Sequence, residues 1–420
     1  MKTEDMKLRE YSKYKDKVEN VMRCINVDSI IAQHKVQSPN KAVGIDGVSK
    51  SEYAINIKAN ITELVTKMKK MQYIPKAARR VYIPKSNGRL RGLGLPSYED
   101  KLVQGAFASC LTSIYEERFL NCSFGFRPKR SAHDAIREIV HASTRGKVSY
   151  VVEADIKGFF DNVDHEWMMK FLEHDIADKV FLRYIKRFLK AGVMENGKYL
   201  ESEKGTPQGG LISPVLANVY LHYVLDMWAE RIVKPRAKGQ VYYVRYADDF
   251  VFMCQYKVDA ENILRSLPAR LAKFGLEVAE DKTRYFPFGR FCKEKETFDF
   301  LGFTIYGGTT LNGKYCTKVR TSSKKLKAKR AAIKEWLWKH ILVPTDELLR
   351  ELSVKLRGHN QYYGVSGNLK SISKFYQFVR RRLYRLLKRK SQRSNITYEK
   401  LKRIWNEYIT PPSIKVYIGY

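Results

Sequence analysis

The sequence is poor in acidic residues. Only 44 aspartates and glutamates stand against 78 lysines and arginines in 420 residues, which gives a formal net charge of +34. Solubility alone does not require such an excess, so we expect a polyanionic partner. Because 44% of the residues are hydrophobic, a disordered basic tail is excluded and a folded nucleic-acid-binding protein is indicated. A ribosomal-type RNA-binding protein remains an alternative on composition alone.

The sequence also lacks paired cysteines and long apolar runs. Its six cysteines are scattered, with no Cys-x-x-Cys and no histidine pair at zinc spacing, which predicts buried thiols in a reducing cytosol. The most apolar stretch, residues 211–228, is interrupted by Asn218, His222 and Asp226, and the charged first residues contain no signal-peptide core. We therefore expect no membrane span.

Local patterns predict helices and then a hairpin in the first part of the chain. Residues 1–75 are expected to be mainly helical, with one apolar helical face formed by Ile61, Leu64, Val65 and Met68. A β-hairpin is expected over residues 80–89, because Asn87-Gly88 is a strong tight-turn signal. Ser131, with Asp134 three residues later, has the pattern of a capping box that opens a helix.

The middle of the chain alternates strands and helices. Residues 148–156 are expected to form a buried strand, and residues 241–254 two strands joined by Ala247-Asp248-Asp249. Ser213-Pro214 predicts a helix start, because proline is favoured in the first turn. This alternation predicts an α+β palm. After about residue 315 it gives way to lysine- and arginine-rich helices, expected over residues 324–340, 348–363 and 369–393.

Three aspartates are placed for metal-dependent phosphoryl transfer. That reaction uses two divalent metal ions about 3.5 to 4 Å apart, and hard ions such as magnesium prefer oxygen ligands. Asp155 lies at the end of one predicted strand, and Asp248 and Asp249 lie at the tip of a hairpin with apolar flanks. We therefore expect the three carboxylates to converge on one site. An Asp-Asp pair taken alone is also common in ordinary turns.

The motifs around these aspartates resemble a known family. Tyr246-Ala-Asp-Asp249 looks like the reverse-transcriptase signature, and residues 155–165 resemble the metal-binding motif of the group II intron branch. Gly205-Thr-Pro-Gln-Gly-Gly210 with Ile212-Ser-Pro214 is similar to the third motif of that branch. Its finger motifs are matched in order by residues 83–85, 91–104 and 123–135. From about residue 44 to about residue 393 the chain thus resembles group II intron-encoded reverse transcriptases, which carry a maturase domain.

The resemblance implies an RNA-directed DNA polymerase of α+β class, a right-hand polymerase with fingers and palm and an appended α-helical thumb or maturase domain. The implied divisions are an N-terminal extension and start of the fingers over 1–75, fingers over 76–145, palm over 146–315, thumb or maturase domain over 316–393, and a short C-terminal extension over 394–420. Related proteins often continue into an endonuclease. No nuclease signature is found here, so we expect the form that lacks this domain.

The resemblance also implies roles for residues of the polymerase site. Asp155, Asp248 and Asp249 are expected to be catalytic and to bind two Mg²⁺ ions, with Mn²⁺ as a possible substitute, and Ile156 is expected to add its backbone carbonyl. The implied nucleotide-binding residues are Lys85, Arg91, Phe160, Gln208 and Lys282. Phe160 is expected to exclude the ribose 2′-hydroxyl, and Lys282 to act near the leaving pyrophosphate. A core phenylalanine and a surface lysine are the respective alternatives.

Aromatic and basic residues are interleaved in the C-terminal part, a pattern that suits base stacking and phosphate contacts. The resemblance places a primer grip at Phe300, Leu301 and Gly302. The residues expected to bind nucleic acid are Arg127, Lys355, Arg357, Asn360, Tyr362, Tyr363, Arg380, Arg381 and Arg382. The alternative is a helical bundle whose aromatic residues form the core and whose charges are solvated.

The implied partners are an RNA template, a DNA primer, deoxynucleoside triphosphates and group II intron RNA; no oligomeric state is implied. The resemblance places the protein in the bacterial cytoplasm, associated with the nucleoid when it acts on DNA. Two alternatives stay open. One is a polymerase recruited by the cell for DNA repair or phage defence, and the other is a splicing factor that binds RNA without polymerising.

Overall fold

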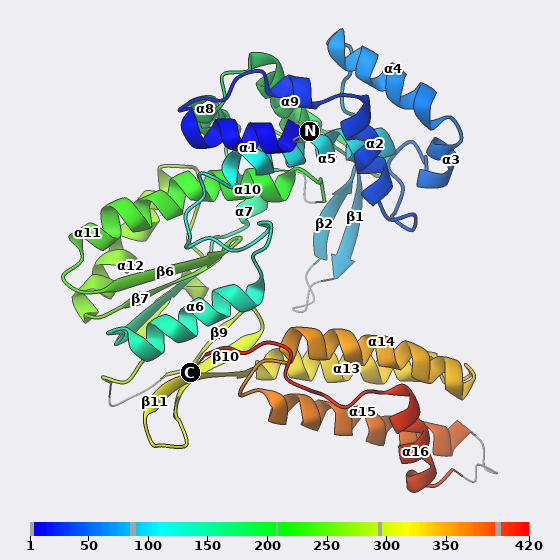
Figure 1. Ribbon diagram of the computed structural model, residues 1–420, viewed down its shortest axis with the longest axis vertical. Coiled ribbons are helices and arrows are strands. Elements are labelled where there is room, and N and C mark those ends of the chain that lie inside the picture. Colours follow the sequence, from blue (N-terminus) through cyan, green and yellow to red (C-terminus); the bar gives the residue numbers. More distant parts are fainter. Residues whose placement is uncertain (1–3, 85–89, 207–208, 293–295, 391–395, 420) are drawn as a thin grey trace.

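The computed structural model describes residues 4–84, 90–206, 209–292, 296–390 and 396–419. Helices and strands are mixed along the chain, so the expected α+β class is confirmed. Figure 1 shows a mainly helical region that carries the N-terminus, a central sheet beneath it, and a group of C-terminal helices at the opposite end of the molecule. Below, α13–α16 are called the C-terminal helical domain.

A four-stranded antiparallel sheet lies at the centre. Its strands, in order across the sheet, are β6 (Val241–Tyr246), β7 (Asp249–Cys254), β3 (Tyr150–Ala154) and β8 (Arg284–Pro287). The strand before Asp155 and the two strands of residues 241–254 are therefore confirmed. Asp249 is the first residue of β7.

Helices cover both faces of this sheet, because alternate strand residues point to opposite sides. Val152 and Phe252 join one core, which includes α10 (Ser213–Leu221) and α12 (Lys257–Ala272). Val151 and Met253 join a second core with α6 (Ala132–Arg145). The expected helix start at Ser213-Pro214 and the capping box that opens α6 are both confirmed.

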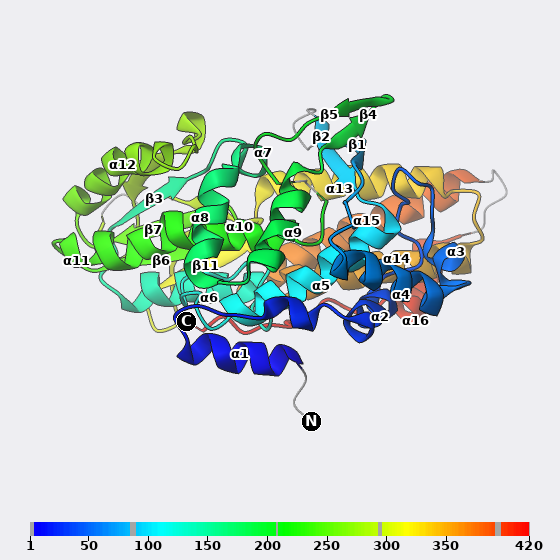
Figure 2. The same ribbon diagram turned by 90° about the horizontal axis from the view of Figure 1, so that it is seen from above.

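The N-terminal region is helical and carries a hairpin. Its helices are α1 (Glu4–Tyr14), α2 (Val27–Val36), α3 (Lys50–Ala54), α4 (Ile57–Lys69) and α5 (Tyr98–Tyr115). The apolar face predicted within residues 1–75 is the buried face of α4. Strands β1 (Ala78–Pro84) and β2 (Leu90–Leu95) form the expected hairpin, whose Asn87-Gly88 turn lies outside the described residues. Figure 2 shows α1 on the outside of the molecule, where it packs along α5.

Shorter elements complete the region around the central sheet. They are 3-10 turns Val21–Cys24 and Glu280–Lys282, helices α7 (Phe159–Asn162), α8 (His165–Asp175), α9 (Lys179–Lys190) and α11 (Lys234–Arg236), strands β4 (Val193–Glu195) and β5 (Lys198–Leu200), and π-helical turns His222–Asp226 and Ala229–Val233. The apolar stretch over residues 211–228 is therefore a buried helix. No helix in the described ranges is long and apolar enough to cross a membrane. None of the six cysteines, all of which the structure describes, is in a disulfide, and five are buried.

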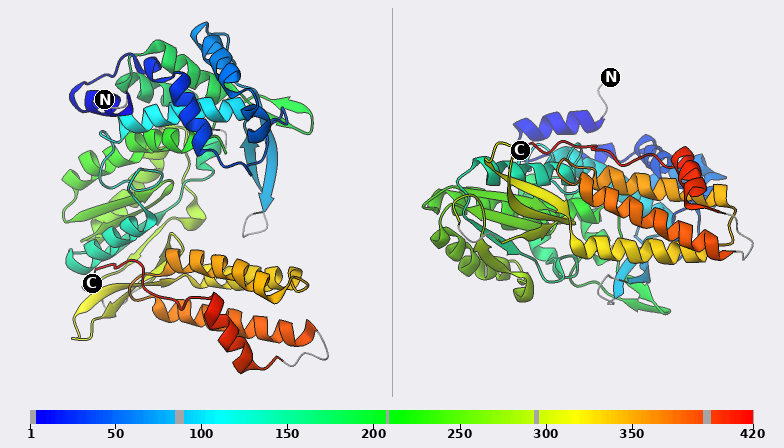
Figure 3. Two further views of the ribbon diagram at one scale, coloured as in Figure 1. Left: turned by 45° about the vertical axis from the view of Figure 1, so that its right-hand side comes forward. Right: turned by 90° about the horizontal axis from the view of Figure 1, so that it is seen from below.

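The C-terminal part begins with a three-stranded sheet of β9 (Phe298–Phe300), β10 (Phe303–Thr309) and β11 (Tyr315–Thr321). Helices α13 (Ser323–Lys339), α14 (Thr345–Tyr363), α15 (Leu369–Lys390) and α16 (Tyr398–Tyr408) follow. Figure 3 shows α13 and α15 side by side. The strands continue beyond the expected transition at about residue 315, because β11 pairs with β10 along its whole length.

Residues 396–419, within the predicted C-terminal extension, pack against the rest of the protein. Leu401 and Trp405 of α16 belong to the same core as α14 and α15. After α16, Val416 pairs with Val365, and Ile418 is buried in the core beneath the central sheet. The C-terminal residues thus connect the helical domain to the rest of the protein.

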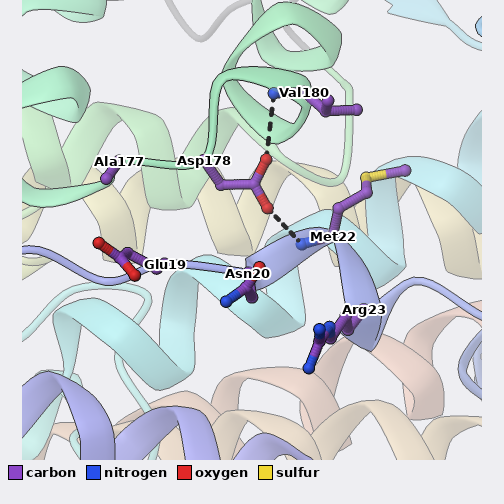
Figure 4. Close-up of a pocket in the computed structure, with 7 residues that line it drawn as sticks. All are labelled: Glu19, Asn20, Met22, Arg23, Ala177, Asp178 and Val180. Carbon is purple, nitrogen blue, oxygen red and sulfur yellow. Dashed lines mark hydrogen bonds between the residues drawn. The ribbon is translucent and has the colours of Figure 1, made fainter.

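The N-terminal segment is tied to α9 by one carboxylate. Asp178 caps α9 by accepting hydrogen bonds from the amides of Val180 and Phe181, each 3.0 Å long, and it also accepts one of 2.9 Å from the Met22 amide. Figure 4 shows the carboxylate between these amides in a pocket of about 430 Å³. The oxygens of the Asp178 carboxylate therefore join the N-terminal segment to α9.

Candidate active site

Asp155, Asp248 and Asp249 lie at neighbouring strand ends. Asp155 follows β3, and Asp248 lies in the two-residue turn between β6 and β7, whose flanking pair is Tyr246 and Asp249. Since Ala154 pairs with Phe250, the end of β3 coincides with the start of β7. Asp155 and Asp248 line one pocket of about 1130 Å³, and Asp155 and Asp249 line a smaller one of about 120 Å³. The structure therefore brings the three expected carboxylates together.

The carboxylates influence one another's ionisation. Burial and the charge of Asp155 raise the pKa of Asp248 above its ordinary value, while Arg91 and Arg245 act in the opposite direction. Removal from water, followed by the charges of Asp248 and Asp155, raises the pKa of Asp249 to about 7. Repulsion of this kind is typical of carboxylates that share a site. A cation placed among them would relieve it.

Lys282 supplies one cation. Its Nζ lies 2.5 Å from Oδ2 of Asp155. In the part of the chain that the structure describes, no three His, Cys, Asp or Glu side chains are arranged to hold a metal ion as they stand. The donors that line the two pockets are nevertheless carboxylate oxygens, which Mg²⁺ and Mn²⁺ prefer. The site fits a hard divalent cation once Asp155 releases Lys282. Ile156 lines the same pocket.

Comparisons with known families agree with this arrangement. The family of reverse transcriptases (RNA-dependent DNA polymerases) matches residues 83–305, and the group II intron maturase-specific domain matches residues 326–405. The chain belongs to the group II intron reverse transcriptases. It is an RNA-directed DNA polymerase with a maturase domain, and this family generally uses divalent metal ions. The maturase match ends beyond the expected boundary at residue 393, as the packing of α16 requires.

Two curated relatives illustrate the similarity. Protein YkfC of Escherichia coli is 32% identical over 328 residues, which are 70% of this chain and 84% of YkfC. The group II intron-encoded protein LtrA of Lactococcus lactis is 31% identical over 75% of this chain and 65% of LtrA. This reverse transcriptase thus spans less than two thirds of LtrA.

A buried ion pair lies beneath the Ala247-Asp248 turn of this reverse transcriptase. Arg245 and Asp226 are both 0% exposed, and two N–H groups of Arg245 donate to the Asp226 carboxylate at 2.6 and 2.5 Å. The other three donate to Asn218 Oδ1, Ser123 Oγ and the Ala247 carbonyl. Burial alone would raise the pKa of Asp226, but the Arg245 guanidinium holds it below its ordinary value. Every donor of Arg245 is therefore used to fix the turn and its neighbours.

Sequence reasoning missed this pair as a functional element. The available signal was an arginine inside an otherwise apolar strand and an aspartate inside the most apolar stretch of the chain. Ionised side chains are buried almost only with a partner. That rule indicates that a partner exists, but it does not identify which of many charged residues it is.

The motif over residues 123–127 supports the same turn. A Cβ on Gly125 would lie 2.4 Å from the Ala247 amide nitrogen, so the backbone there packs directly on the turn. The structure corrects the expectation that Arg127 binds nucleic acid. Its side chain is 2% exposed, pairs with Glu116 at 2.9 Å, and donates to the carbonyls of Leu120 and Ser123. Its charge is directed into the protein.

The expected nucleotide-binding residues are partly brought together. Phe160, Arg91 and Lys282 line the large pocket with Asp155 and Asp248. Lys85 and Gln208 lie outside the described residues, so their positions stay predictions.

The expected primer grip lies next to the carboxylates. Leu301 and Gly302 form the turn between β9 and β10, where Phe300 pairs with Phe303. Phe300 and Leu301 line the smaller pocket together with Asp155 and Asp249. The gripping role itself stays a prediction.

The residues expected to bind nucleic acid from the C-terminal helices divide into two groups. Lys355, Arg357 and Arg381 are exposed. Arg380 and Arg382 are half-buried, with Arg380 donating to Tyr398 at 3.1 Å and Arg382 lying over the ring of Phe378. The exposed side chains of Lys355, Arg357 and Arg381 are therefore available to contact a polyanion.

Asn360, Tyr362 and Tyr363 form the second group, whose side chains pack against the protein. Asn360 is 5% exposed. Tyr362 and Tyr363 pack against Phe303 beside the β9–β10 turn. Asn360 therefore belongs to the protein interior, whereas Tyr362 and Tyr363 are half-buried and their contact with nucleic acid stays a prediction.

Proposed function

We propose that this reverse transcriptase is a right-hand polymerase that extends a DNA primer on an RNA template. The N-terminal helices with hairpin β1–β2 are assigned as fingers, the central sheet as palm, and the C-terminal helical domain as thumb. The observation that carries the proposal is the shared pocket of Asp155 and Asp248, with Asp249 beside it. The same three residues are proposed to bind two Mg²⁺ ions, or Mn²⁺ in their place, together with the carbonyl of Ile156.

When bound, the ions would make the primer hydroxyl a better nucleophile and neutralise charge on the phosphates. The chain's own residues hold the nucleotide. Phe160 is assigned to contact the sugar, and Arg91 to offset charge on the triphosphate. Lys282, which donates a hydrogen bond to Asp155 in this structure, is assigned to give a proton to the leaving pyrophosphate once that hydrogen bond is released. Lys85 and Gln208 are assigned on their motifs alone.

The second proposed role is as a maturase for group II intron RNA. LtrA is named as a group II intron-encoded protein, and this chain shares the maturase-specific domain. The exposed Lys355, Arg357 and Arg381 support an RNA-binding surface on that domain. The second candidate is a polymerase that the cell has recruited for DNA repair or phage defence. A gene that is not surrounded by an intron RNA would favour this candidate. The converging carboxylates weigh against a splicing factor that has lost synthesis. We also propose that the protein acts in the bacterial cytoplasm, at the nucleoid.

Primer extension on an RNA template with Mg²⁺ tests the polymerase site. We expect the parent to incorporate deoxynucleotides and Asp248→Ala to lose synthesis, because one ligand of both ions is removed. Binding of the RNA–DNA duplex should survive, since the contacts that hold it lie elsewhere. Asp259→Ala is a matched control, because Asp259 accepts hydrogen bonds from the Lys238 and Gly239 amides and lines neither carboxylate pocket. Synthesis by Asp248→Ala at the parental rate would overturn the assignment.

A further inference from the structure

The turn assigned as primer grip has an unfavourable backbone. Leu301 and Gly302 both have positive φ values, 48° and 79°. Positive φ at both central residues is the geometry of a type I′ hairpin turn, which favours asparagine and glycine. A leucine in the left-handed region is disfavoured, so the surrounding structure must hold it there.

Both carbonyls of the turn are bound from the thumb side. The Tyr362 hydroxyl of α14 donates to the Leu301 carbonyl at 2.8 Å, and the Ser322 amide, directly before α13, donates to the Gly302 carbonyl at 3.0 Å. A Cβ on Gly302 would lie 2.9 Å from the Tyr363 hydroxyl, so the fit is close. The turn is thus held by the start of α13 and the end of α14.

Tyr362 is itself fixed from the opposite side. Its ring stacks on Phe303, with centroids 5.6 Å apart and planes at 22°. Nε2 of His133, on α6, lies 2.6 Å from the Tyr362 carbonyl. Burial raises the pKa of Tyr362 to about 12, so the hydroxyl keeps its proton and remains a donor at neutral pH. The side chain therefore connects α6, α14 and the turn.

The turn is adjacent to the reacting centre. Leu301 and Phe300 share the smaller pocket with Asp155 and Asp249. We propose that Tyr362 is a positioning residue, which fixes the Leu301-Gly302 turn and thereby places the primer terminus beside the carboxylates. This inference rests on the proposed polymerase function. It makes one side chain of the maturase domain part of the geometry of DNA synthesis.

Tyr362→Phe tests the inference, because it keeps the ring on Phe303 and removes only the hydroxyl. Tyr376→Phe is the matched control: the Tyr376 hydroxyl also donates to a backbone carbonyl at 2.8 Å, that of Leu356, within the thumb. Each variant loses one comparable hydrogen bond. Similar falls in melting temperature are therefore expected from the two.

Single-turnover addition of one deoxynucleotide to a preformed RNA template–DNA primer duplex separates the two variants. We expect the rate at saturating nucleotide to fall about tenfold in Tyr362→Phe and by less than about twofold in Tyr376→Phe. The nucleotide dissociation constant should stay near the parental value in both. The fluorescence of 2-aminopurine at the primer terminus should change only in Tyr362→Phe.

The outcomes distinguish the positioning role of Tyr362 from the proposed polymerase function on which it rests. Equal rates and equal fluorescence for the two tyrosine variants would show a hydrogen bond that only stabilises the fold, and the positioning role would be overturned. Full synthesis by Asp248→Ala would instead remove the polymerase assignment itself. Loss of synthesis in Asp248→Ala, with a rate defect confined to Tyr362→Phe, supports both.

Discussion

Phe159 and Phe160 are neighbours in sequence with opposite surroundings. Phe159 is 2% exposed in the core, whereas Phe160 lines the pocket that contains Asp155 and Asp248. Gly158, with φ of 55°, provides the left-handed residue from which α7 begins. The orientation of this short helix therefore decides which ring faces the pocket.

Phe160→Val should weaken discrimination against ribonucleotides. The smaller side chain leaves room for a 2′-hydroxyl, so incorporation of a ribonucleotide relative to its deoxynucleotide should rise by about tenfold or more, in the range that one steric contact gives. Competitive single-nucleotide incorporation measures this ratio. Phe159→Val is the control, and it should lower stability by roughly 1–3 kcal/mol while leaving sugar selection alone. Unchanged discrimination in Phe160→Val would remove the assignment.

Asp249 gives a prediction about pH. Its pKa is raised to about 7 in the fold, from an ordinary value of 3.8. A raised carboxyl pKa means that ionisation opposes folding: the penalty is absent below the ordinary pKa, grows as pH rises between the two values, and is complete above the folded one. In chelator, Asp249→Asn should therefore raise the melting temperature at about pH 8 and have little effect at about pH 4.

Thermal melts with and without Mg²⁺ complete this test. The ion should raise the melting temperature of the parent more than that of Asp249→Asn, because metal bound by the folded state stabilises it. Ser202→Ala, a change at a half-buried serine outside both carboxylate pockets, is a suitable control. A stabilisation by Asp249→Asn that is the same at every pH would contradict the electrostatic explanation.

Residue types and the family motifs predicted that Asp155, Asp248 and Phe160 lie at one site, and the three line one pocket, while their roles stay predictions. The same signals failed for Arg127 and Asn360, and they gave no sign that the Tyr362 hydroxyl binds a backbone carbonyl. An arginine or tyrosine in a basic, aromatic segment looks the same whether it faces solvent or a buried carboxylate or carbonyl. Which face it occupies is decided by Glu116 and Leu301, partners that periodicity does not identify.

At the scale of elements, the β6–β7 hairpin depends on a support that comes from three other segments. Arg245 on β6 joins Asp226 in a π-helical turn, Asn218 on α10 and Ser123 in the loop after α5. Its donation to the Ala247 carbonyl reaches the turn directly, at 3.0 Å. Ala247 has a φ of 55°, so this hydrogen bond holds a conformation that alanine disfavours.

Arg245→Met should destabilise the protein by about 3–5 kcal/mol, because Asp226 is left as an unpaired buried charge. Urea unfolding measures the loss. The double variant Arg245→Met/Asp226→Leu should recover most of that stability, since neither charge remains. Primer extension should stay low in the double variant, because the Ala247 carbonyl has lost its donor. Parental synthesis in the stable double variant would show that the pair serves folding alone.

Local signals also explain which elements were predictable. Strands β3, β6 and β7 of the central sheet, the α6 capping box and the buried face of α4 depend on residues within one turn or one strand. The extent of β11 and the packing of α16 depend on distant partners, β10 and the core of α14 and α15. The composition change near residue 315 therefore does not coincide with the end of β11, and the domain divisions themselves stay predictions.

At the scale of the whole molecule, the net charge of +34 is distributed over surfaces with different functions. One such surface is a groove of about 500 Å³ between α13 and α15, lined by Trp338, Lys334, Arg385 and Arg389 among others. Trp338 is 65% exposed. The residues that line this groove are distinct from those of the carboxylate pockets. Exposed cations around an exposed indole suit unpaired bases and their phosphates.

RNA binding by this groove should show two separable effects. Arg385→Ala/Arg389→Ala should lower the slope of log affinity against log salt by about 1.4, since each lost phosphate contact on a single strand contributes about 0.7. Trp338→Ala should weaken binding of a single-stranded oligonucleotide by about tenfold at every salt concentration without changing the slope, because stacking releases no counterions. Fluorescence anisotropy over a salt series measures both quantities. Arg265→Ala/Lys273→Ala removes the same charge from α12 and should leave the slope nearly unchanged. If Arg265→Ala/Lys273→Ala lowers the slope as much as Arg385→Ala/Arg389→Ala, RNA binding depends on the net charge of the molecule. The groove would then not be a specific binding site.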